Sequence, residues 1–162
     1  MKTEILGVDI GGVLIDRVAD GTDTSFFSQR YLETPAVAES FATLALLRAG
    51  RFGAAIHLVS KCGPTVEAKT RRWLAHHRFA EIAGVPEAHL HFCRERPDKA
   101  PICARLGVTH FVDDRLDVLE YLKTVGRRYL FQPRDKDRAR AVREKTDVVV
   151  VGSWAEIARD LL

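Results

Sequence analysis

The chain has 162 residues, of which 46% are hydrophobic and 29% charged, a balance typical of a globular protein. A net charge of +3 allows an anionic substrate but does not require nucleic acid, and no apolar run approaches the length of a membrane span. The composition therefore speaks against a membrane protein and predicts a single domain over residues 1–162.

The cysteines indicate a reducing compartment. Cys62, Cys93 and Cys103 are odd in number and lack paired spacing, which predicts free thiols. The first residues lead directly into an apolar strand, without the long hydrophobic core of a signal peptide. We therefore expect a cytoplasmic protein.

The first predicted strand ends at a carboxylate. The apolar run at residues 5–8 has the length of a strand that is buried on both faces, and it stops at Asp9. Gly11 and Gly12 follow, where the backbone can adopt a positive φ or lie close to a ligand, and a second apolar run leads to Asp16. Open α/β sheets place their chemistry at such strand ends. The alternative is that Asp9 only caps a turn.

Strands and helices alternate along the rest of the chain. Residues 17–34 are polar and predict a loop with a short helix that covers the site. Apolar runs predict further strands at residues 54–59, 89–92, 110–112, 128–131 and 148–151. Helical spacing predicts helices at residues 35–50, 64–77, 79–83, 99–106, 116–124 and 135–145 and a C-terminal helix capped by Ser153. Asp98 is the expected cap of the helix that begins at Lys99, and the alternation predicts a mostly parallel sheet with helices on both faces.

Polar residues at three strand ends should meet at one edge of that sheet. They are Asp9, Ser60 and the pair at residues 113–114, and Lys99 begins a helix that can reach the same edge. Carboxylates suit Mg²⁺, and a hydroxyl and an ammonium suit a phosphoryl group. Asp9 could then act as a nucleophile and form an aspartyl-phosphate. Without a cation nearby, the neighbouring carboxylates would repel one another.

The sequence resembles the haloacid dehalogenase-like (HAD) superfamily in four places. Residues 9–14 (Asp-Ile-Gly-Gly-Val-Leu) resemble its first motif, residues 58–60 its second, Lys99 its third, and residues 111–114 with Asp117 its fourth. The resemblance implies a Rossmann-like three-layer α/β sandwich with a minimal cap or none. It also implies a Mg²⁺-dependent phosphatase that acts on phosphate esters through an aspartyl-phosphate.

The resemblance also implies roles for individual residues. Asp9 would attack the phosphoryl group, and Ser60 and Lys99 would hold its oxygens. Asp114 would bind the metal with the assistance of Asp113. The expected substrate-binding residues are Gly11, Gly12, Ser60, Lys61 and Lys99, and the expected metal ligands are Asp9, Asp113, Asp114 and the backbone carbonyl of Gly11.

One position departs from the family's pattern. Phosphatases of the family usually carry a second Asp two residues after the nucleophile as a general acid/base, and here that position is Gly11. Its loss should slow hydrolysis unless Asp16 replaces it, because acid–base catalysis contributes roughly 10²–10⁴-fold. A weak or inactive HAD-like module that binds a phosphorylated ligand or a protein partner is therefore the main alternative. Hydrolysis at carbon is less favoured, because it would not need the pair at residues 113–114.

Two further features of the resemblance bear on the substrate. The helix after Lys99 is short, so Lys61 or Arg96 could take the role of Lys99. The spacing of the motifs leaves no room for a large cap, and a small cap or flap would lie within residues 17–53. An open site would suit a macromolecular phosphoester, or a phosphorylated small molecule enclosed by a neighbouring subunit of a homo-oligomer.

Other polar clusters are weaker candidates for function. The pair at residues 76–77 and the His89-x-His91 pattern suggest a zinc site only weakly. Cys62 is more simply a structural cysteine than a reactive thiol. The arginines that flank the strand at residues 128–131 favour a solvated surface over a site for an anionic tail; they are Arg127, Arg128 and Arg134.

Overall fold

The computed structural model describes residues 3–17, 26 and 28–162, and these form a layered α/β fold around one sheet. The strands are β1 (Leu6–Val8), β2 (Ile56–Lys61), β3 (Leu90–Cys93), β4 (His110–Asp113), β5 (Arg127–Phe131) and β6 (Val149–Val151). Their order is β3-β2-β1-β4-β5-β6, and every neighbouring pair is parallel. The predicted parallel sheet is confirmed. The winding reverses between β1 and β4, where open sheets of this kind bind ligands.

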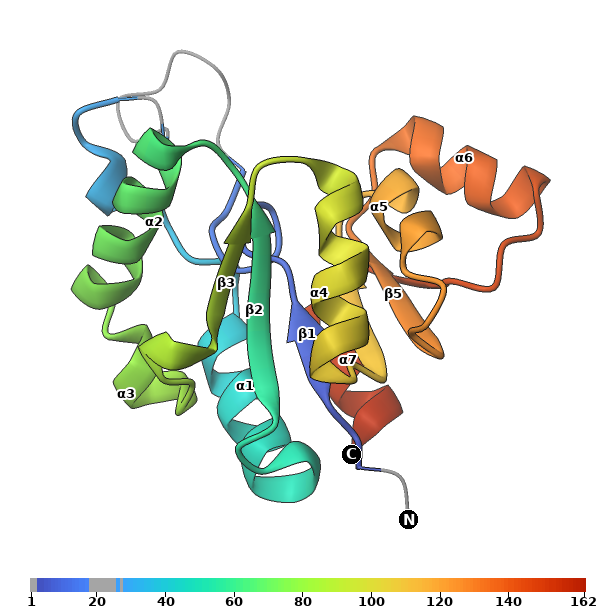
Figure 1. The fold of residues 1–162 in the computed structure, drawn as a ribbon, viewed down its shortest axis with the longest axis horizontal. Coiled ribbons are helices and arrows are strands. Elements are labelled where there is room, and N and C mark those ends of the chain that lie inside the picture. Colours follow the sequence, from blue (N-terminus) through green and yellow to red (C-terminus); the bar gives the residue numbers. More distant parts are fainter. Residues whose placement is uncertain (1–2, 18–25, 27) are drawn as a thin grey trace.

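Helices cover both faces of the sheet and make it the middle layer of three (Figure 1). The helices are α1 (Ser40–Leu47), α2 (Pro64–His76), α3 (Phe79–Ala83), α4 (Lys99–Leu106), α5 (Leu116–Tyr121), α6 (Asp135–Arg143) and α7 (Trp154–Leu161). The shorter helical turns are η1 (Tyr31–Glu33), η2 (Arg48–Phe52), η3 (Glu87–His89) and η4 (Arg96–Asp98). Core residues of α1, α2, α3 and α7 belong to one buried cluster, and those of α4, α5 and α6 belong to the other. The Rossmann-like three-layer architecture is therefore as predicted.

A glycine lets the two central strands pack closely around one aromatic ring. Gly7 in β1 pairs with Phe111 in β4. A Cβ atom at Gly7 would lie 2.5 Å from Cδ2 of the Phe111 ring, well inside van der Waals contact. Only glycine therefore leaves room for this ring beside β1. The contact matters for the site because these two strands carry the carboxylates at their ends.

The helix predicted from Pro35 begins only at Ser40, so the prediction was wrong at this end. Pro35 suits the first turn of a helix, but its carbonyl accepts a hydrogen bond from the backbone N–H of Asp16 at 2.9 Å. The backbone N–H of Val37 donates to the carbonyl of Leu14 at 2.8 Å. These long-range bonds hold the segment extended beside the loop after β1.

Residues 40–52 form α1 and η2 of the helical layer. Leu44 and Leu47 of α1 are fully buried against the sheet, and η2 continues directly from that helix. Within the predicted loop at residues 17–34, η1 provides a short helical turn. Residues 18–25 and 27 of that loop lie outside the described part of the chain, so its expected role as a cover over the site stays a prediction.

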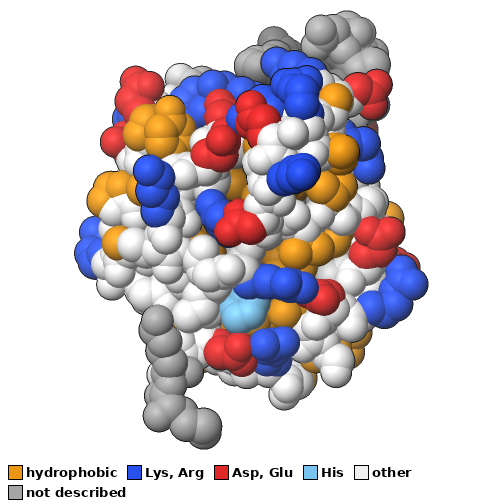
Figure 2. All heavy atoms as spheres, turned by 90° about the vertical axis from the view of Figure 1, so that its right-hand side faces the viewer, with side chains coloured by type: hydrophobic (Ala, Val, Ile, Leu, Met, Phe, Trp, Pro, Cys, Tyr) orange, Lys and Arg blue, Asp and Glu red, His pale blue; other side chains and the backbone are white. Residues whose placement is uncertain are grey.

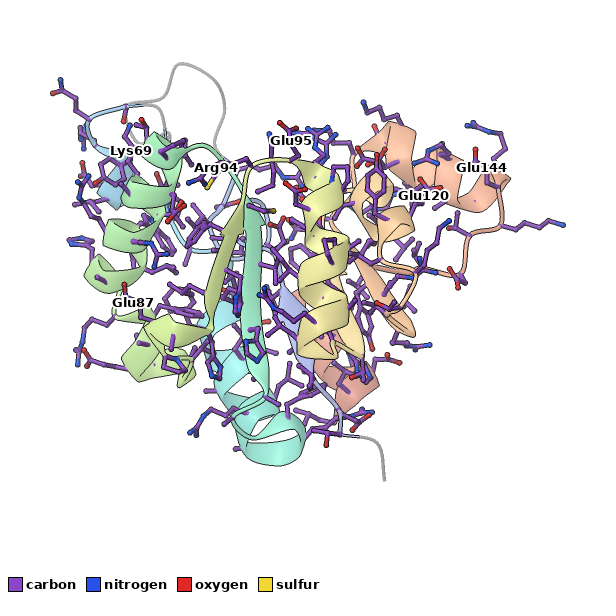
Figure 3. The ribbon with its side chains drawn as sticks, viewed as in Figure 1. Lys69, Glu87, Arg94, Glu95, Glu120 and Glu144 are labelled. Carbon is purple, nitrogen blue, oxygen red and sulfur yellow. The ribbon has the colours of Figure 1, made fainter. Side chains whose placement is uncertain are left out.

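Several predicted helix ends are confirmed, and one predicted cap is not. Helix α3 stops at Gly84, which has a φ of 78°. The side chain of Ser153 accepts a hydrogen bond from the N–H of Glu156 at 3.2 Å, which caps α7 as predicted. Asp98 instead accepts from the N–H of Glu95 at 3.1 Å and caps the preceding turn, η4. Figure 3 shows Glu95 in the connection between the upper end of β3 and the top of α4.

The cysteines are free thiols, as predicted, and Cys93 and Cys103 are buried.

Helix α5 ends three residues earlier than expected, at Tyr121, and α6 ends at Arg143 rather than at residue 145. No helix among the described residues has both the length and the apolar character needed to cross a bilayer.

Candidate active site

The central strands bring three carboxylates together. Asp9 follows β1, and Asp113 ends β4, the neighbouring parallel strand. The backbone N–H of Asp9 donates to the carbonyl of Val112 at 2.9 Å, so the sheet pairing continues up to the site. Asp114 comes next along the chain. The two regions, about one hundred residues apart in sequence, therefore meet at the carboxyl edge of the sheet, where the sequence places them.

Lys99 joins two of these carboxylates from the first residue of α4. It is only 2% exposed, and its Nζ donates to Oδ1 of Asp9 at 3.0 Å and to Oδ2 of Asp113 at 2.9 Å. Burial alone would lower the pKa of Lys99, but the two carboxylates outweigh burial and raise it above its ordinary value. The lysine is therefore a cation near neutral pH. The short helix that follows it does not prevent it from reaching the two carboxylates.

Lys99, and not the alternatives drawn from the sequence, contacts the expected nucleophile. Arg96 lies 3.6 Å from Asp117, at the start of α5. Asp117 also pairs with Arg115 at 3.2 Å, so this carboxylate lies with the arginines and outside the three-carboxylate cluster. Lys61 is exposed at the end of β2 and has no ion pair with a described residue.

Burial controls the protonation of the cluster. Burial raises the pKa of Asp9, Asp113 and Asp114 to about 6 in each case, and repulsion from a neighbouring carboxylate adds to the effect. Lys99 opposes the rise for all three, and Arg17, 3.7 Å from Asp114, also opposes it there. Near neutral pH the cluster therefore holds more negative charge than Lys99 alone balances.

The donor set fits a hard divalent cation. Oxygen atoms of Asp9, Asp113 and Asp114 lie within 4.8 Å of one another. Both oxygens of Asp113 already accept hydrogen bonds, Oδ2 from Lys99 and Oδ1 from the N–H of Arg115 at 3.0 Å. Asp9 and Asp114 are consequently the better placed ligands, and few carboxylate ligands with remaining waters are typical of Mg²⁺.

The two glycines of the loop after β1 serve different purposes. Gly12 has a φ of 78°, and a Cβ there would lie 2.4 Å from Oδ2 of Asp114. A side chain at Gly12 would therefore displace a candidate metal ligand. A Cβ at Gly11 would instead face open space, with no atom within 4 Å. Helix α7 holds this loop in place, because the indole N–H of its first residue, Trp154, donates to the carbonyl of Val13 at 2.9 Å.

A pocket of about 460 Å³ opens above these residues. Its floor and walls include the residues predicted for the site, namely Asp9, Gly11, Gly12, Ser60, Lys61, Lys99, Asp113 and Asp114. Ser60 is 7% exposed at the end of β2, one strand away from Asp9. Asp16, the candidate replacement acid/base, also lines this pocket. The structure thus brings all the predicted site residues to one cavity.

Three arginines of this pocket are not marked as site residues by the sequence pattern. Arg17, Arg115 and Arg134 all line the cavity. No motif includes Arg17 or Arg115, and the sequence favours a solvated surface for Arg134. Figure 2 shows Lys and Arg side chains, with Asp and Glu among them, gathered along the upper edge of the face on the α6 side. Their places in the sequence could have marked two of them as site residues, because Arg115 directly follows Asp114 and Arg134 follows the end of β5.

The histidines are separate from this site. Nδ1 of His57 lies 3.0 Å from Nε2 of His91, and the His57 ring stacks on His89. Burial lowers the pKa of His57 to about 4, so this side chain is neutral near pH 7. His77 packs on a tryptophan and bonds a backbone carbonyl, that of Leu32. Among the described residues, the three-carboxylate cluster is the group with metal-site spacing, and the histidines do not form a second one.

No protein-family model matches the chain and no curated protein matches it in sequence, whereas solved structures resemble it over nearly its whole length. The cobalt-bound deoxy-D-mannose-octulosonate 8-phosphate phosphatase of Haemophilus influenzae has a TM-score of 0.59 and 16% identity over 99% of this chain and 88% of that one. A protein of Burkholderia xenovorans described as a haloacid dehalogenase-like hydrolase has a TM-score of 0.63 and 11% identity over 97% and 96%. A phosphoserine phosphatase in its apo form has a TM-score of 0.60 and 12% identity over 99% and 100%. The chain therefore has the fold of the haloacid dehalogenase-like hydrolases.

Proposed function

We propose that the protein is a Mg²⁺-dependent phosphatase that hydrolyses phosphate monoesters, with Asp9 as its nucleophile. The observation that carries the proposal is the buried ammonium of Lys99 between Asp9 and Asp113, beside Asp114, at the floor of the pocket. Two of the structural neighbours are phosphatases, which supports the same reaction class.

The proposed reaction assigns one task to each residue. Lys99 donates to Oδ1 of Asp9 and orients its carboxylate toward the pocket. Asp9 attacks phosphorus, the ester oxygen leaves with its electron pair, and an aspartyl-phosphate forms. Water then attacks that phosphorus, which releases inorganic phosphate and restores the carboxylate. Ser60 and Lys99 hold the phosphoryl oxygens, and Mg²⁺ held by Asp9, Asp114, Asp113 and the Gly11 carbonyl would offset the negative charge.

The leaving oxygen needs a proton that Gly11 cannot supply. Asp16 is the pocket carboxylate that lies outside the three-carboxylate cluster, and because its side chain is exposed we assign it only part of this role. An aryl ester leaves as a stabilised phenolate and depends little on an acid, whereas an alkyl ester depends on it strongly. The protein should therefore hydrolyse aryl phosphates faster than alkyl phosphates.

Phosphate release from p-nitrophenyl phosphate with and without Mg²⁺ tests the proposal. The Asp9→Asn variant should lose activity, because the amide is a far poorer nucleophile than the carboxylate. Asp135→Asn is the matched control, since this exposed carboxylate begins α6 outside the pocket and should leave activity unchanged. Unchanged release in Asp9→Asn, or no release from any of a broad panel of phosphomonoesters, would refute the proposal.

The Gly11→Asp variant tests the missing acid/base. Because a Cβ at this position meets open space, the new carboxyl can enter the pocket without displacing another atom. Alkyl phosphate hydrolysis should rise by up to about 10²–10⁴-fold, and aryl phosphate hydrolysis should rise much less. Binding of Mg²⁺ and inorganic phosphate by calorimetry, with no turnover in either protein, would identify a binding module instead.

A further inference from the structure

The charge of the side chains that line the pocket differs from one side of its rim to the other. Side chains from α2 supply a neutral wall, where Val66 and Thr70 face the cavity together with Phe26. The rest of the rim is rich in cations. The cationic side chains above the floor are Arg17, Lys61, Arg96, Arg115 and Arg134. The phosphoryl group needs only the groups at the floor, so the additional positive charge requires a separate explanation.

Most of these arginines are already paired. Arg17 lies 3.7 Å from Asp114 and donates through Nη2 to the carbonyl of Gln132 at 2.6 Å. Arg96 and Arg115 share the carboxylate of Asp117. These contacts hold the three guanidinium groups at the rim and give each of them a carboxylate partner.

Arg134 differs from the others in having no ion pair or side-chain hydrogen bond with any residue in the described part of the chain. Its backbone is nevertheless well anchored, because its carbonyl accepts from the N–H groups of Asp137 and Arg138 at 3.0 Å each in the first turn of α6. The side chain is exposed and lines the pocket. An anchored, unpaired guanidinium at the mouth of a cavity is suited to bind an anion in two parallel hydrogen bonds.

The other arginines near β5 form ion pairs with carboxylates, which Arg134 does not. Arg127 lies 2.8 Å from Asp160, and Arg128 pairs with Asp147. Both arginines occupy the amino end of β5, opposite to the pocket. Lys61 is also unpaired but ends β2, three strands away from β5, or about 14 Å at ordinary strand spacing. Lys61 therefore lies on the opposite side of the central strands β1 and β4 from Arg134.

We propose that the substrate is a small phosphomonoester with a second anionic group, a carboxylate or another phosphate, which Arg134 binds at the β5 side of the pocket. The inference rests on the proposed phosphatase function and names its substrate class. Arg17 and Arg115 line the same cavity, but their charges are offset by Asp114 and Asp117, so Arg134 is the arginine left for such a group. A pocket of about 460 Å³ has the size of sites for small molecules, which favours such a substrate over a macromolecule.

Matched three-carbon substrates test the proposal. Phosphate release should be measured for 3-hydroxypropyl phosphate, 3-(phosphonooxy)propanoate and propane-1,3-diyl bisphosphate, with Mg²⁺ present. At least one of the two esters with an anionic tail should have a kcat/KM about tenfold or more above the neutral one, mainly through KM. Whichever of these two esters has the higher kcat/KM shows whether the second anionic group of the substrate is a carboxylate or a phosphate. Equal kcat/KM for all three would overturn the proposal.

Variants of Arg134 test whether this residue binds the second anionic group. Arg134→Gln should remove the preference and leave hydrolysis of 3-hydroxypropyl phosphate within about twofold, and Arg134→Lys should restore part of the preference. Arg138→Gln is the matched control, because Arg138 lies on α6 outside the pocket. An equal loss for all three substrates in Arg134→Gln would show a structural role and refute the assignment.

A binding measurement separates this inference from the proposed function. Calorimetry should compare 3-phosphonopropanoate with propylphosphonate, because neither compound has a phosphate ester bond that a phosphatase could hydrolyse. Tighter binding of the carboxylate compound, lost in Arg134→Gln, supports the inference even if no substrate is turned over. Equal binding of the two compounds overturns it even if the protein is an active phosphatase.

Discussion

Replacing Lys99 by methionine should destabilise the folded protein strongly and in a pH-dependent way. Methionine has a similar length but carries no charge, so the variant leaves Asp9 and Asp113 buried without their shared cation. Breaking a buried ion pair by removing one partner typically costs about 3–5 kcal/mol. In a chain of this size each kcal/mol lowers Tm by about 2–4 °C, so Tm should fall by about 6–20 °C.

The sign of the pH dependence follows from the raised pKa values. Burial raises the pKa of Asp9 and Asp113 to about 6 from an ordinary value of 3.8, and Lys99 limits that rise. A carboxyl with a higher pKa in the folded state binds its proton more tightly there. Its contribution to stability therefore falls as the pH rises from about 4 through 6. Without Lys99 both pKa values rise further, so the variant should lose most stability above pH 7 and little at pH 5.

Urea unfolding followed by circular dichroism, in EDTA at pH 8 and pH 5, measures both effects. Lys61→Met is the matched control, because this lysine is exposed and unpaired among the described residues, and its loss should change stability by less than about 0.5 kcal/mol. If Lys99→Met is as stable as the unmodified protein at pH 8, or equally destabilised at both pH values, the reasoning is wrong.

Three further predictions concern the site and the strands that carry it. Saturating MgCl₂ should raise Tm more at pH 7.5 than at pH 5, since carboxyls with pKa values of about 6 are ionised only at the higher pH, and an equal rise would contradict the metal site. Gly12→Ala should weaken Mg²⁺ binding in calorimetry by displacing Asp114, whereas Gly11→Ala should not, and similar affinities would exclude this packing effect. Gly7→Ala should cost about 1–3 kcal/mol in urea unfolding because its Cβ meets the Phe111 ring, and the control Gly126→Ala, which meets no atom within 4 Å, should cost much less.

The arrangement of the strand ends could be predicted because it depends on local patterns. Short apolar runs that end at Asp9, Ser60 and Asp113 identify buried strands, and a parallel sheet brings such ends to one edge. The resemblance of the motifs to HAD proteins then adds Lys99. These predictions depend on hydrophobic periodicity and strand direction, both of which can be read without knowing the tertiary packing.

Features that depend on long-range contacts could not be predicted in this way. The delayed start of α1 results from hydrogen bonds between Pro35 and Val37 and the loop after β1, which no local signal encodes. The contact of His57 with His91 depends on the register between β2 and β3. Arg134 stands in a polar stretch without periodicity, so only the structure distinguishes it from the paired arginines at the other end of β5.

The neighbouring glycines after Asp9 also have different evolutionary freedom. Position 12 is constrained by the atoms of Asp114, so most replacements there would displace this candidate metal ligand. Position 11 is open, and a change from glycine to aspartate needs only a single base substitution. The fold can therefore gain or lose a carboxyl at this position without first acquiring a compensating mutation. Descendants of one ancestor can therefore differ in the carboxyl groups of this pocket while their cores stay the same.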